Sequence, residues 1–366
     1  MSLLTILLFS LFSFITGARN PGAPQQAELI FVGDAMMHQA QIDKAKELGG
    51  GKRYNYDDCF TLIAPTVTNA DYAVVNLETP LGGGPSYTGF PCFSAPDSYA
   101  VALQDAGFDM FLTANNHSLD RHDKGVRRTV EVLDSLGVDH TGSWHNSAER
   151  EKKPHVIKNI KGFKVGFLNY TYGTNGIKPK SGAVVALIDR ERMKKDIRNL
   201  RDAGAEIVTV CIHWGEEYQL RENSVQRSLA QFLKEQKVDL IIGSHPHVIQ
   251  PMEMEINPAT GKNTLVVYSL GNFLSNMKTN DTRGGALARV ILERDSNGTA
   301  KVKEASYDTF YAAKPSGAGT NYQVVPSWTP SGIPAQQKGW WNTFNNRATG
   351  IFNRYNRNVS RWHNID

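Results

Sequence analysis

The chain has 366 residues, of which 40% are apolar and 21% are charged, and its net charge is +4 at pH 7. This length suits one large domain or two ordinary ones, and the composition is that of a globular protein. The mild positive charge allows an anionic partner. The sequence contains no basic helix with interleaved aromatic residues and no zinc-finger spacing, so we expect no nucleic acid partner.

The first 18 residues form a predicted signal peptide. Residues 3–15 are almost wholly apolar, and the small residues Thr16-Gly17-Ala18 follow at a plausible cleavage point. Such a stretch is too short to cross a bilayer comfortably and suits the apolar region of a signal peptide. We therefore expect an exported protein, periplasmic or at the cell surface, with residues 19–26 as a linker. The alternative is an uncleaved N-terminal membrane anchor, because Met1-Ser2 carries no Lys or Arg.

Apolar periodicity and turn signals predict alternating strands and helices up to residue 242. The strands are expected at 27–33, 71–76, 108–113, 155–160, 163–169, 205–212 and 238–242, and the helices at 41–48, 58–70, 98–106, 123–136, 190–203 and 222–236. The chain then becomes β-rich, with strand-like segments at 248–256, 263–269, 285–293 and 300–311. Alternation followed by a β-rich half predicts an α/β fold in which two sheets pack together with helices outside.

Residues 313–366 form a basic, aromatic C-terminal extension to the domain predicted at 27–312. Cations and aromatic residues are interleaved toward its end: Lys338, Arg347, Arg354, Arg357 and Arg361 with Trp340, Trp341, Phe344, Phe352, Tyr355 and Trp362. One interpretation is a tail that binds a surface or a polyanion. The other, which the composition favours, is a packing extension or a disordered segment with a few anchoring aromatic residues.

Cysteine is sparse, with Cys59, Cys92 and Cys211 as its three positions. An exported protein could pair Cys59 with Cys92. Cys211 lies in a strand-like run and is expected in the core. So few cysteines exclude a disulfide scaffold and a cysteine-rich metal site.

Five short polar motifs follow predicted strands. They are Gly33-Asp34, Asn76-Leu77-Glu78, Asn115-Asn116-His117, His213-Trp214-Gly215 and His245-Pro246-His247. In an open α/β sheet the carboxyl ends of the strands line one edge, where ligands bind. Imidazole, carboxylate and carboxamide groups gathered there are suitable ligands for divalent transition metals. Singly, each motif has an ordinary structural explanation, such as a helix cap for Asp34.

Six blocks of the sequence resemble the CapA-type proteins, the poly-γ-glutamate capsule biosynthesis proteins, which are a branch of the calcineurin-like metallophosphoesterases. The blocks are GDAMMH, NLETPL, ANNHSLD, IHWGEEY, GSHPHVIQP and VVYSLGNF, in that order, and the resemblance covers about residues 27–312. It implies a four-layer α/β/β/α sandwich of two mixed sheets, a metallophosphoesterase-like fold. By analogy with the superfamily it also implies one or two divalent metal ions, with Mn, Zn or Fe expected.

The resemblance also implies roles for individual residues. It assigns the metal ligands as Asp34, Glu78, Asn116, His213, His245 and His247. Glu78 occupies the region of the bridging carboxylate, although Asn76 is an alternative for that role. His117 corresponds to a proton donor that binds no metal. Asp120 could orient His117, or it could serve only a local turn or cap.

One position departs from the superfamily. Its first motif is usually Asp-x-His, whereas this chain has Asp34-Ala35-Met36. A thioether is a poor ligand for hard or borderline ions, so one metal site lacks its usual imidazole. Asn76 or His38 could compensate. The favoured interpretation is that Asn76 holds the loop and that His38 is a nearby polar residue.

Further polar residues after predicted strands are candidates for substrate contact. Asn76, Glu216 and Asn272 are the main ones, and Glu217 and Tyr218 adjoin Glu216. Loop structure explains each of them equally well. Arg221 and Arg283 could meet an anionic substrate, although a solvated surface position is the favoured interpretation.

Three functions are compatible with this pattern. The first is an exported protein that synthesises, releases or anchors poly-γ-glutamate, hydrolysing or transferring an amide or ester bond with a metal-bound hydroxide. Its partners would be an anionic envelope polymer such as poly-γ-glutamate and membrane-bound capsule synthesis proteins. The second is a phosphoesterase. The third is a non-catalytic accessory of capsule assembly with a structural metal site.

Overall fold

Two mixed β-sheets pack face to face in the computed structural model, which describes residues 25–363. The first sheet holds β1 (Gln26–Ala35), β2 (Tyr72–Leu77), β3 (Met110–Leu112), β4 (Asp139–Thr141), β13 (Asn272–Leu274), β14 (Gly284–Arg294), β15 (Ala300–Ala313), β16 (Gln323–Pro326) and β17 (Ser360–Arg361). The second holds β6 (Val156–Ile160), β7 (Phe163–Thr171), β9 (Ile207–His213), β10 (Leu240–Ser244), β11 (Met252–Ile256) and β12 (Asn263–Val267). A small ribbon pairs β5 (Ser143–Trp144) with β8 (Val184–Val185).

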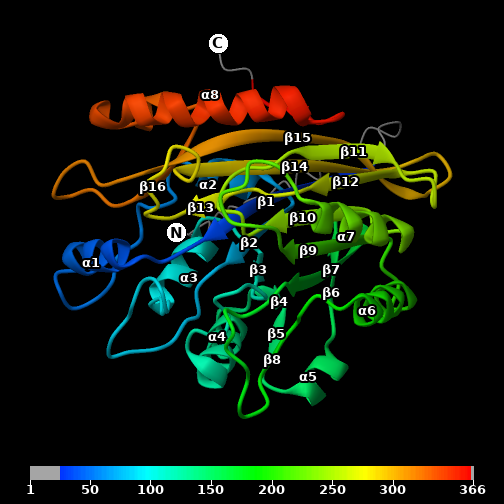
Figure 1. Ribbon diagram of the computed structural model, residues 1–366, viewed down its shortest axis with the longest axis horizontal. Coiled ribbons are helices and arrows are strands. Elements are labelled where there is room, and N and C mark those ends of the chain that lie inside the picture. Colours follow the sequence, from blue (N-terminus) through cyan, green and yellow to red (C-terminus); the bar gives the residue numbers. More distant parts are fainter. Residues whose placement is uncertain (1–24, 364–366) are drawn as a thin grey trace, which may run out of the picture.

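Helices cover the outer faces of both sheets (Figure 1). Those of the first half of the chain are α1 (Gln39–Leu48), α2 (Ala64–Asn69), α3 (Asp97–Asp105), α4 (His122–Leu136) and α5 (Ser147–Lys152). They are followed by α6 (Arg190–Asp202), α7 (Ser224–Glu235) and α8 (Lys338–Tyr355). Helix α1 and helix α3 pack on the first sheet, and α6 and α7 pack on the second. The four-layer α/β/β/α sandwich is therefore confirmed.

The core between the sheets explains why the central strands are apolar throughout. Phe31 and Val74 of the first sheet share one buried cluster with Phe167 and Leu265 of the second. Every residue of β9 is buried, because a second cluster covers its outer face with Leu200 of α6 and other helix residues. Strands buried on both faces are continuous β-branched runs, as in Ile207–His213.

Most predicted elements are present, and the exceptions have local causes. The helix expected at 58–70 is reduced to α2, whose first turn contains Pro65; proline is tolerated there but not farther inside a helix. The strand expected at 248–256 begins only at Met252. The hairpin turn at Lys161-Gly162 is confirmed, and both residues have positive φ, at 47° and 90°.

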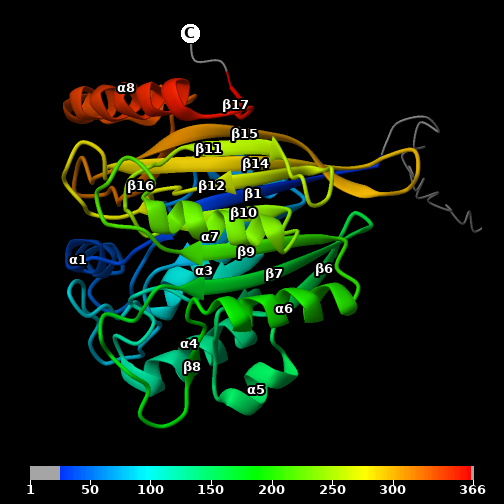
Figure 2. The same cartoon turned by 45° about the vertical axis from the view of Figure 1, so that its right-hand side comes forward.

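The C-terminal extension packs on the body of the protein. Helix α8 lies along β15 at the end of the molecule opposite α5 (Figures 1 and 2). Its Phe344 and Phe352 are buried in the core between the sheets, and β16 and β17 both pair with β15. A packing extension therefore describes this segment as far as His363.

The two remaining sequence expectations concern the N-terminal signal peptide and the pairing of Cys59 with Cys92. The predicted signal peptide lies outside the described residues. No helix within residues 25–363 has the length and apolar character needed to span a bilayer. The proposed Cys59–Cys92 disulfide is wrong: both thiols are free, because Cys59 is enclosed in the core whereas Cys92 is exposed.

Candidate metal centre

The five polar motifs meet at one edge of the sandwich. Asp34 lies near the end of β1 and Glu78 directly follows β2, while Asn116 lies in the turn after β3. From the second sheet, His213 ends β9, and His245 and His247 follow β10. All six side chains are at most 3% exposed, so the site is built below the surface.

The backbone is specialised where these side chains are positioned. A Cβ atom on Gly33 would lie 1.8 Å from the carbonyl oxygen of Gly271, so only glycine permits this close approach beside Asp34. His245 and His247 have φ values of 103° and 57°, in the left-handed region that non-glycine residues rarely adopt. Backbone strain of this kind concentrates at functional sites, where contacts with the surrounding structure keep the residue in the unfavourable conformation.

Asp34 is held from several sides. Its Oδ1 accepts a hydrogen bond of 2.7 Å from the Asn76 amide, and its Oδ2 accepts one of 3.2 Å from the backbone N–H of His245. The Nδ1 atom of His247 lies 3.5 Å from the same Oδ2. Asn76 thus holds the side chain of Asp34 in place, whereas the sequence interpretation expects it to hold the loop.

The side chain of His213, from the second sheet, contacts residues of the first sheet. Its Nε2 lies 2.8 Å from Asn116 Oδ1 and 3.5 Å from Glu78 Oε1, both from the first sheet. Its Nδ1 lies 3.1 Å from the hydroxyl of Ser244. The contact with Ser244 orients the ring so that Nε2 faces Glu78 and Asn116.

Glu78 is the most unusual residue of the site. It is fully buried, yet neither carboxylate oxygen has a hydrogen-bond partner among the described residues. Asn76 Oδ1 and His245 Nδ1 are also buried without a hydrogen-bond partner in the described part of the chain. An unpaired buried carboxylate costs several kcal/mol unless a cation compensates it or it takes up a proton. These unsatisfied donor atoms fit divalent metal ions of the type that the motifs predict.

Two groups of possible ligands share this glutamate. One contains Glu78, His245 and His247, and the other contains Asp34, Glu78 and His213; within each, one donor atom per residue lies within 4.8 Å of the others. A carboxylate common to both groups is what two neighbouring cations require between them. The geometry therefore favours Glu78 over Asn76 as the bridging residue.

Burial and neighbouring charges set the protonation of these residues. Burial lowers the pKa of His213 to about 3, and mainly burial lowers the pKa of His245 to about 2, so both rings are neutral and able to bind metal. Burial acts to raise the pKa of Asp34, but the hydrogen bond with His247 and the nearby histidine charges lower it to about 2. Burial and the charge of Asp34 raise the pKa of Glu78 well above its ordinary value.

His117 and Asp120 form a pair beside these ligands. Nδ1 of His117 lies 2.7 Å from Asp120 Oδ2, which also accepts a hydrogen bond of 2.7 Å from the backbone N–H of Phe93. The Phe93 ring packs edge-on against His117 at 4.5 Å between ring centroids. The pair leaves Nε2 of His117 as the nitrogen available for chemistry.

A cleft of about 450 Å³ opens onto this edge of the sandwich. Asn116, His117, Asp120 and His247 line it, together with Met36, His38, Phe90, Pro91, Cys92, Asn175, Ile177, Glu217, Tyr218 and Met277. This lining includes no Lys or Arg among residues 25–363. The cleft thus offers imidazole, amide, aromatic and carboxylate groups to a substrate.

The remaining candidates occupy different places. Asn272 is fully buried, and its Oδ1 lies 3.0 Å from His247 Nδ1, so it supports that histidine from behind. Glu216 is exposed and does not line the cleft, whereas Glu217 does. His38 contacts Gln41 and the backbone N–H of Asn276, and it belongs to neither ligand group.

Sequence reasoning missed Asn175, which lines the cleft. Its side-chain amide lies within 3.5 Å of His117 Nδ1 and accepts a 3.3 Å hydrogen bond from Asn116. The signal was available, because Asn175-Gly176 is a turn dipeptide shortly after β7, whose end reaches the same edge.

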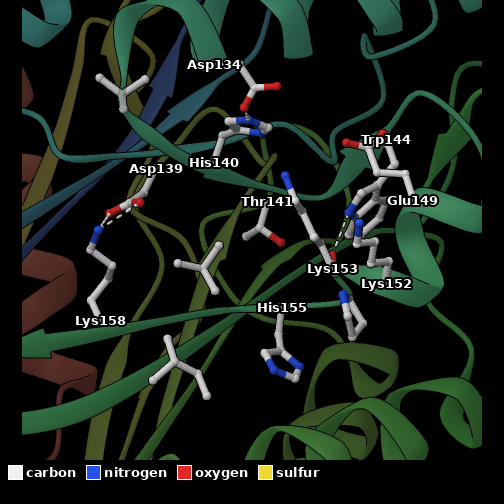
Figure 3. A pocket seen from close by; sticks show the side chains of 14 residues that line it. Asp134, Asp139, His140, Thr141, Trp144, Glu149, Lys152, Lys153, His155 and Lys158 are labelled. Carbon is white, nitrogen blue, oxygen red and sulfur yellow. Dashed lines mark hydrogen bonds and ion pairs between the residues drawn. The ribbon is translucent and has the colours of Figure 1, made fainter. Parts of the chain in front are cut away.

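A second cavity, of about 400 Å³, lies where β4, α5 and β6 meet (Figure 3). Its acids are already paired: Asp134 faces His140 at 3.1 Å, and Asp139 lies 2.8 Å from Lys158. None of the predicted site residues lines it. The chemistry expected of the motifs is therefore restricted to the cleft at the edge where the five motifs meet.

Comparisons with known proteins agree with the sequence resemblance. The model of the family described as "Bacterial capsule synthesis protein PGA_cap" matches residues 28–277. The chain is 30% identical over 286 residues to the capsule biosynthesis protein CapA of Bacillus anthracis, covering 75% of this chain and 66% of that protein. It is 28% identical over 286 residues to the PGA biosynthesis protein CapA of Bacillus subtilis strain 168, covering 74% and 69% respectively.

Two solved structures also align with most of the chain. One is the NAD nucleotidase NadN of Haemophilus influenzae, with a TM-score of 0.44, 10% identity and coverage of 93% of this chain and 65% of that one. The other is a putative 5′-nucleotidase from Staphylococcus aureus, with a TM-score of 0.46, 13% identity and coverage of 88% and 58%. The matched region thus spans about two thirds of the CapA proteins and of NadN, and 58% of the putative 5′-nucleotidase.

Proposed function

This chain belongs to the PGA_cap family of bacterial capsule synthesis proteins, and from that premise we propose that it is an exported, metal-dependent hydrolase or transferase. Its substrate would be an amide or ester bond of an anionic envelope polymer such as poly-γ-glutamate. The observation that carries the proposal is Glu78, a fully buried carboxylate with two unpartnered oxygens, surrounded by Asp34 and three histidines.

Six residues would hold one or two divalent ions. Glu78 would be shared, with Asp34 and His213 on one side and His245 and His247 on the other, and Asn116 adds a carboxamide oxygen 2.8 Å from His213 Nε2. When bound, such ions supply Lewis acidity and lower the pKa of an attacking water. Asn76 and Asn272 would keep Asp34 and His247 in position through the hydrogen bonds described above.

His117 would act as the general acid. Asp120 fixes the ring through Nδ1, so that Nε2 can deliver a proton to a leaving group seated in the cleft. Phe93, against the same ring, excludes water from one side. An accessible cleft beside an acid–base pair favours catalysis over a structural metal site, because structural sites are closed.

Metal analysis combined with an activity panel tests the proposal. The purified protein, loaded with Mn, Zn or Fe, would be given poly-γ-glutamate, peptidoglycan fragments and phosphodiesters. We expect turnover of the γ-glutamyl polymer that disappears on chelation and returns with metal. Turnover of phosphodiesters alone would establish the phosphoesterase alternative, and bound metal without turnover of any of them would establish the accessory function.

A further inference from the structure

Three cations lie in segments next to the cleft, beyond the region that the family model matches. Lys278 follows Met277 of the cleft lining, Arg283 directly precedes β14, and Lys314 directly follows β15. Gly284 pairs with Tyr311 in the antiparallel β14–β15 ladder, and the backbone N–H of Ala312 donates to the carbonyl oxygen of Arg283 at 2.8 Å. Arg283 and Lys314 therefore lie next to each other at the open end of the β14–β15 hairpin, opposite its turn. This open end lies beside the end of β1 that carries Asp34.

These three cations have no counter-ion within residues 25–363. The acid of their own loop, Asp281, is paired with Arg347 instead, at 2.7 Å. Arg283 Nε is buried and has no hydrogen-bond partner among the residues that the structure describes. Burial lowers the pKa of the Lys314 ammonium, and the charges of Arg283 and Lys278 lower it further, with no acid acting in the opposite direction. Like charges gathered without an anion repel one another, so an external anion would stabilise them.

The positions of these cations are fixed by neighbouring elements. Buried Gln337, just before α8, clamps the backbone of Lys314: its Oε1 accepts from the N–H at 3.0 Å, and its Nε2 donates to the carbonyl oxygen at 2.8 Å. The guanidinium of Arg283 lies over the ring of Trp340 in α8, 4.4 Å from its centroid. Preorganisation of this kind lowers the entropic cost of binding.

The cluster is also connected to the metal-binding edge. Asn272, which contacts His247, donates a 3.0 Å hydrogen bond to the carbonyl oxygen of Thr282, next to Arg283. A ligand held at the cluster would therefore lie alongside the reacting groups.

We propose that Lys278, Arg283 and Lys314, with Trp340 beneath Arg283, bind carboxylate groups of an anionic polymer whose reacting bond lies in the adjacent cleft. The nature of this polymer rests on the proposed function. The cleft lining that the structure describes includes no Lys or Arg, so carboxylates flanking the reacting bond need cationic side chains outside it. Arginine suits this role because its planar guanidinium binds carboxylates bidentately. The C-terminal extension thus contributes to substrate binding through α8.

Binding measured without turnover tests this site. Metal-loaded His117→Ala protein would be titrated with a labelled oligo-γ-glutamate, and with polyphosphate of matched charge, at low and at high salt. Arg283→Gln and Lys314→Gln should each weaken oligo-γ-glutamate binding about tenfold, as expected for the loss of a charge-assisted hydrogen bond. Lys278→Gln, on the exposed loop, should weaken it less and remains informative if an Arg283 variant does not fold. Lys194→Gln, an exposed lysine of α6 with the same charge change, is the matched control.

Unchanged affinity in all three cluster variants would overturn the proposal, as would an equal loss in the Lys194 control. Tighter binding of polyphosphate, lost in the same variants, would overturn the assignment to carboxylates. The binding measurement requires no turnover. A negative activity panel would therefore refute the proposed function without deciding whether the cation cluster binds oligo-γ-glutamate.

Discussion

Glu78 is the single residue on which the two ligand groups depend. We expect Glu78→Gln to reduce the metal content by at least half, because the neutral amide cannot bridge two cations. The chelator-treated variant should be at least as stable as the chelator-treated parent, since a buried carboxylate without a partner is removed. Elemental analysis and thermal unfolding measure both effects. Glu216→Gln, an exposed neighbour of the site, should change neither, and full metal content in Glu78→Gln would refute the bridging role.

A substitution of His117 tests proton transfer separately from metal binding. His117→Ala should retain its metal but lose about 10²–10⁴-fold in turnover, the usual contribution of a positioned general acid. Asp120→Asn should lose less, because the ring is retained but less firmly oriented. Steady-state kinetics on the substrate found in the activity panel, with His122→Gln as the exposed control, measure this. Full activity in His117→Ala would leave the residue with a purely structural role.

Met36 marks the metal position that we expect to be the weaker one. It is buried and lines the cleft, at the position where the resemblance described above leads us to expect an imidazole. Met36→His should therefore raise the metal stoichiometry when transition metal is limiting, since an added neutral nitrogen ligand favours such ions over magnesium. Calorimetric titration with Mn or Zn before and after the substitution provides the comparison. Two equally tight sites in the parent protein would show that another residue already completes the ligand set.

At the residue scale the sequence could predict which side chains converge but not how each is used. Strand ends share an edge, so the motifs alone bring Asp34, Glu78 and the histidines together. The sequence could not show that Asn76 and Asn272 would be buried behind the ligands, or that Glu217 rather than Glu216 would face the cleft. Those outcomes depend on loop geometry and hydrogen bonds between distant segments, such as Asn272 with His247.

Among the elements, helix α8 is the one whose role composition could not decide. Its glycines, asparagines and cations are equally compatible with disorder. Contacts with β15, some 40 residues earlier, hold the helix in place: Phe352 packs on Tyr307 with 4.2 Å between ring centroids. Long, periodic segments such as α4 were predictable because a stripe of apolar residues and a terminal glycine, Gly137 at φ 70°, define them locally. Short pieces such as β5 and β8 carry too few residues for any pattern.

The packing of α8 leads to a stability prediction. Phe352→Ala should lower the free energy of unfolding by about 3–5 kcal/mol, the usual cost of emptying a buried phenylalanine site. Asn346→Ala, on the exposed face of the same helix, should change it by less than about 0.5 kcal/mol. Denaturant unfolding measures both. A loss below about 1 kcal/mol for Phe352→Ala would show that α8 contributes little to the folded state.

For the whole molecule, the order of elements was enough to predict two sheets with helices outside, because strand–helix alternation admits few packings. The extension of the first sheet by β16 and β17 was beyond prediction, since these strands pair with β15 through contacts that local sequence does not specify.

The apolar N-terminal segment leads to a prediction about where in the cell the protein is located. We expect cleavage near Ala18, so that the mature protein begins close to the linker at residues 19–26. Leu7→Arg, which places a charge in the apolar stretch, should block export, whereas Asn20→Arg in the linker should not. Cell fractionation and N-terminal sequencing decide the matter. An intact Met1 in the cytoplasmic fraction would remove the support for an envelope substrate.

The ligand residues come from both sheets, three from each, and this has a consequence for motion. An ion held between Glu78 and His213 would resist any opening of the two layers at this edge. A ligand that binds only the folded state raises the free energy of unfolding by about 2.7 kcal/mol when its concentration is a hundred times the dissociation constant. Amide hydrogen exchange at the carboxyl ends of β1, β9 and β10 should therefore slow when metal is supplied, and exchange at the far ends of the same strands should change much less.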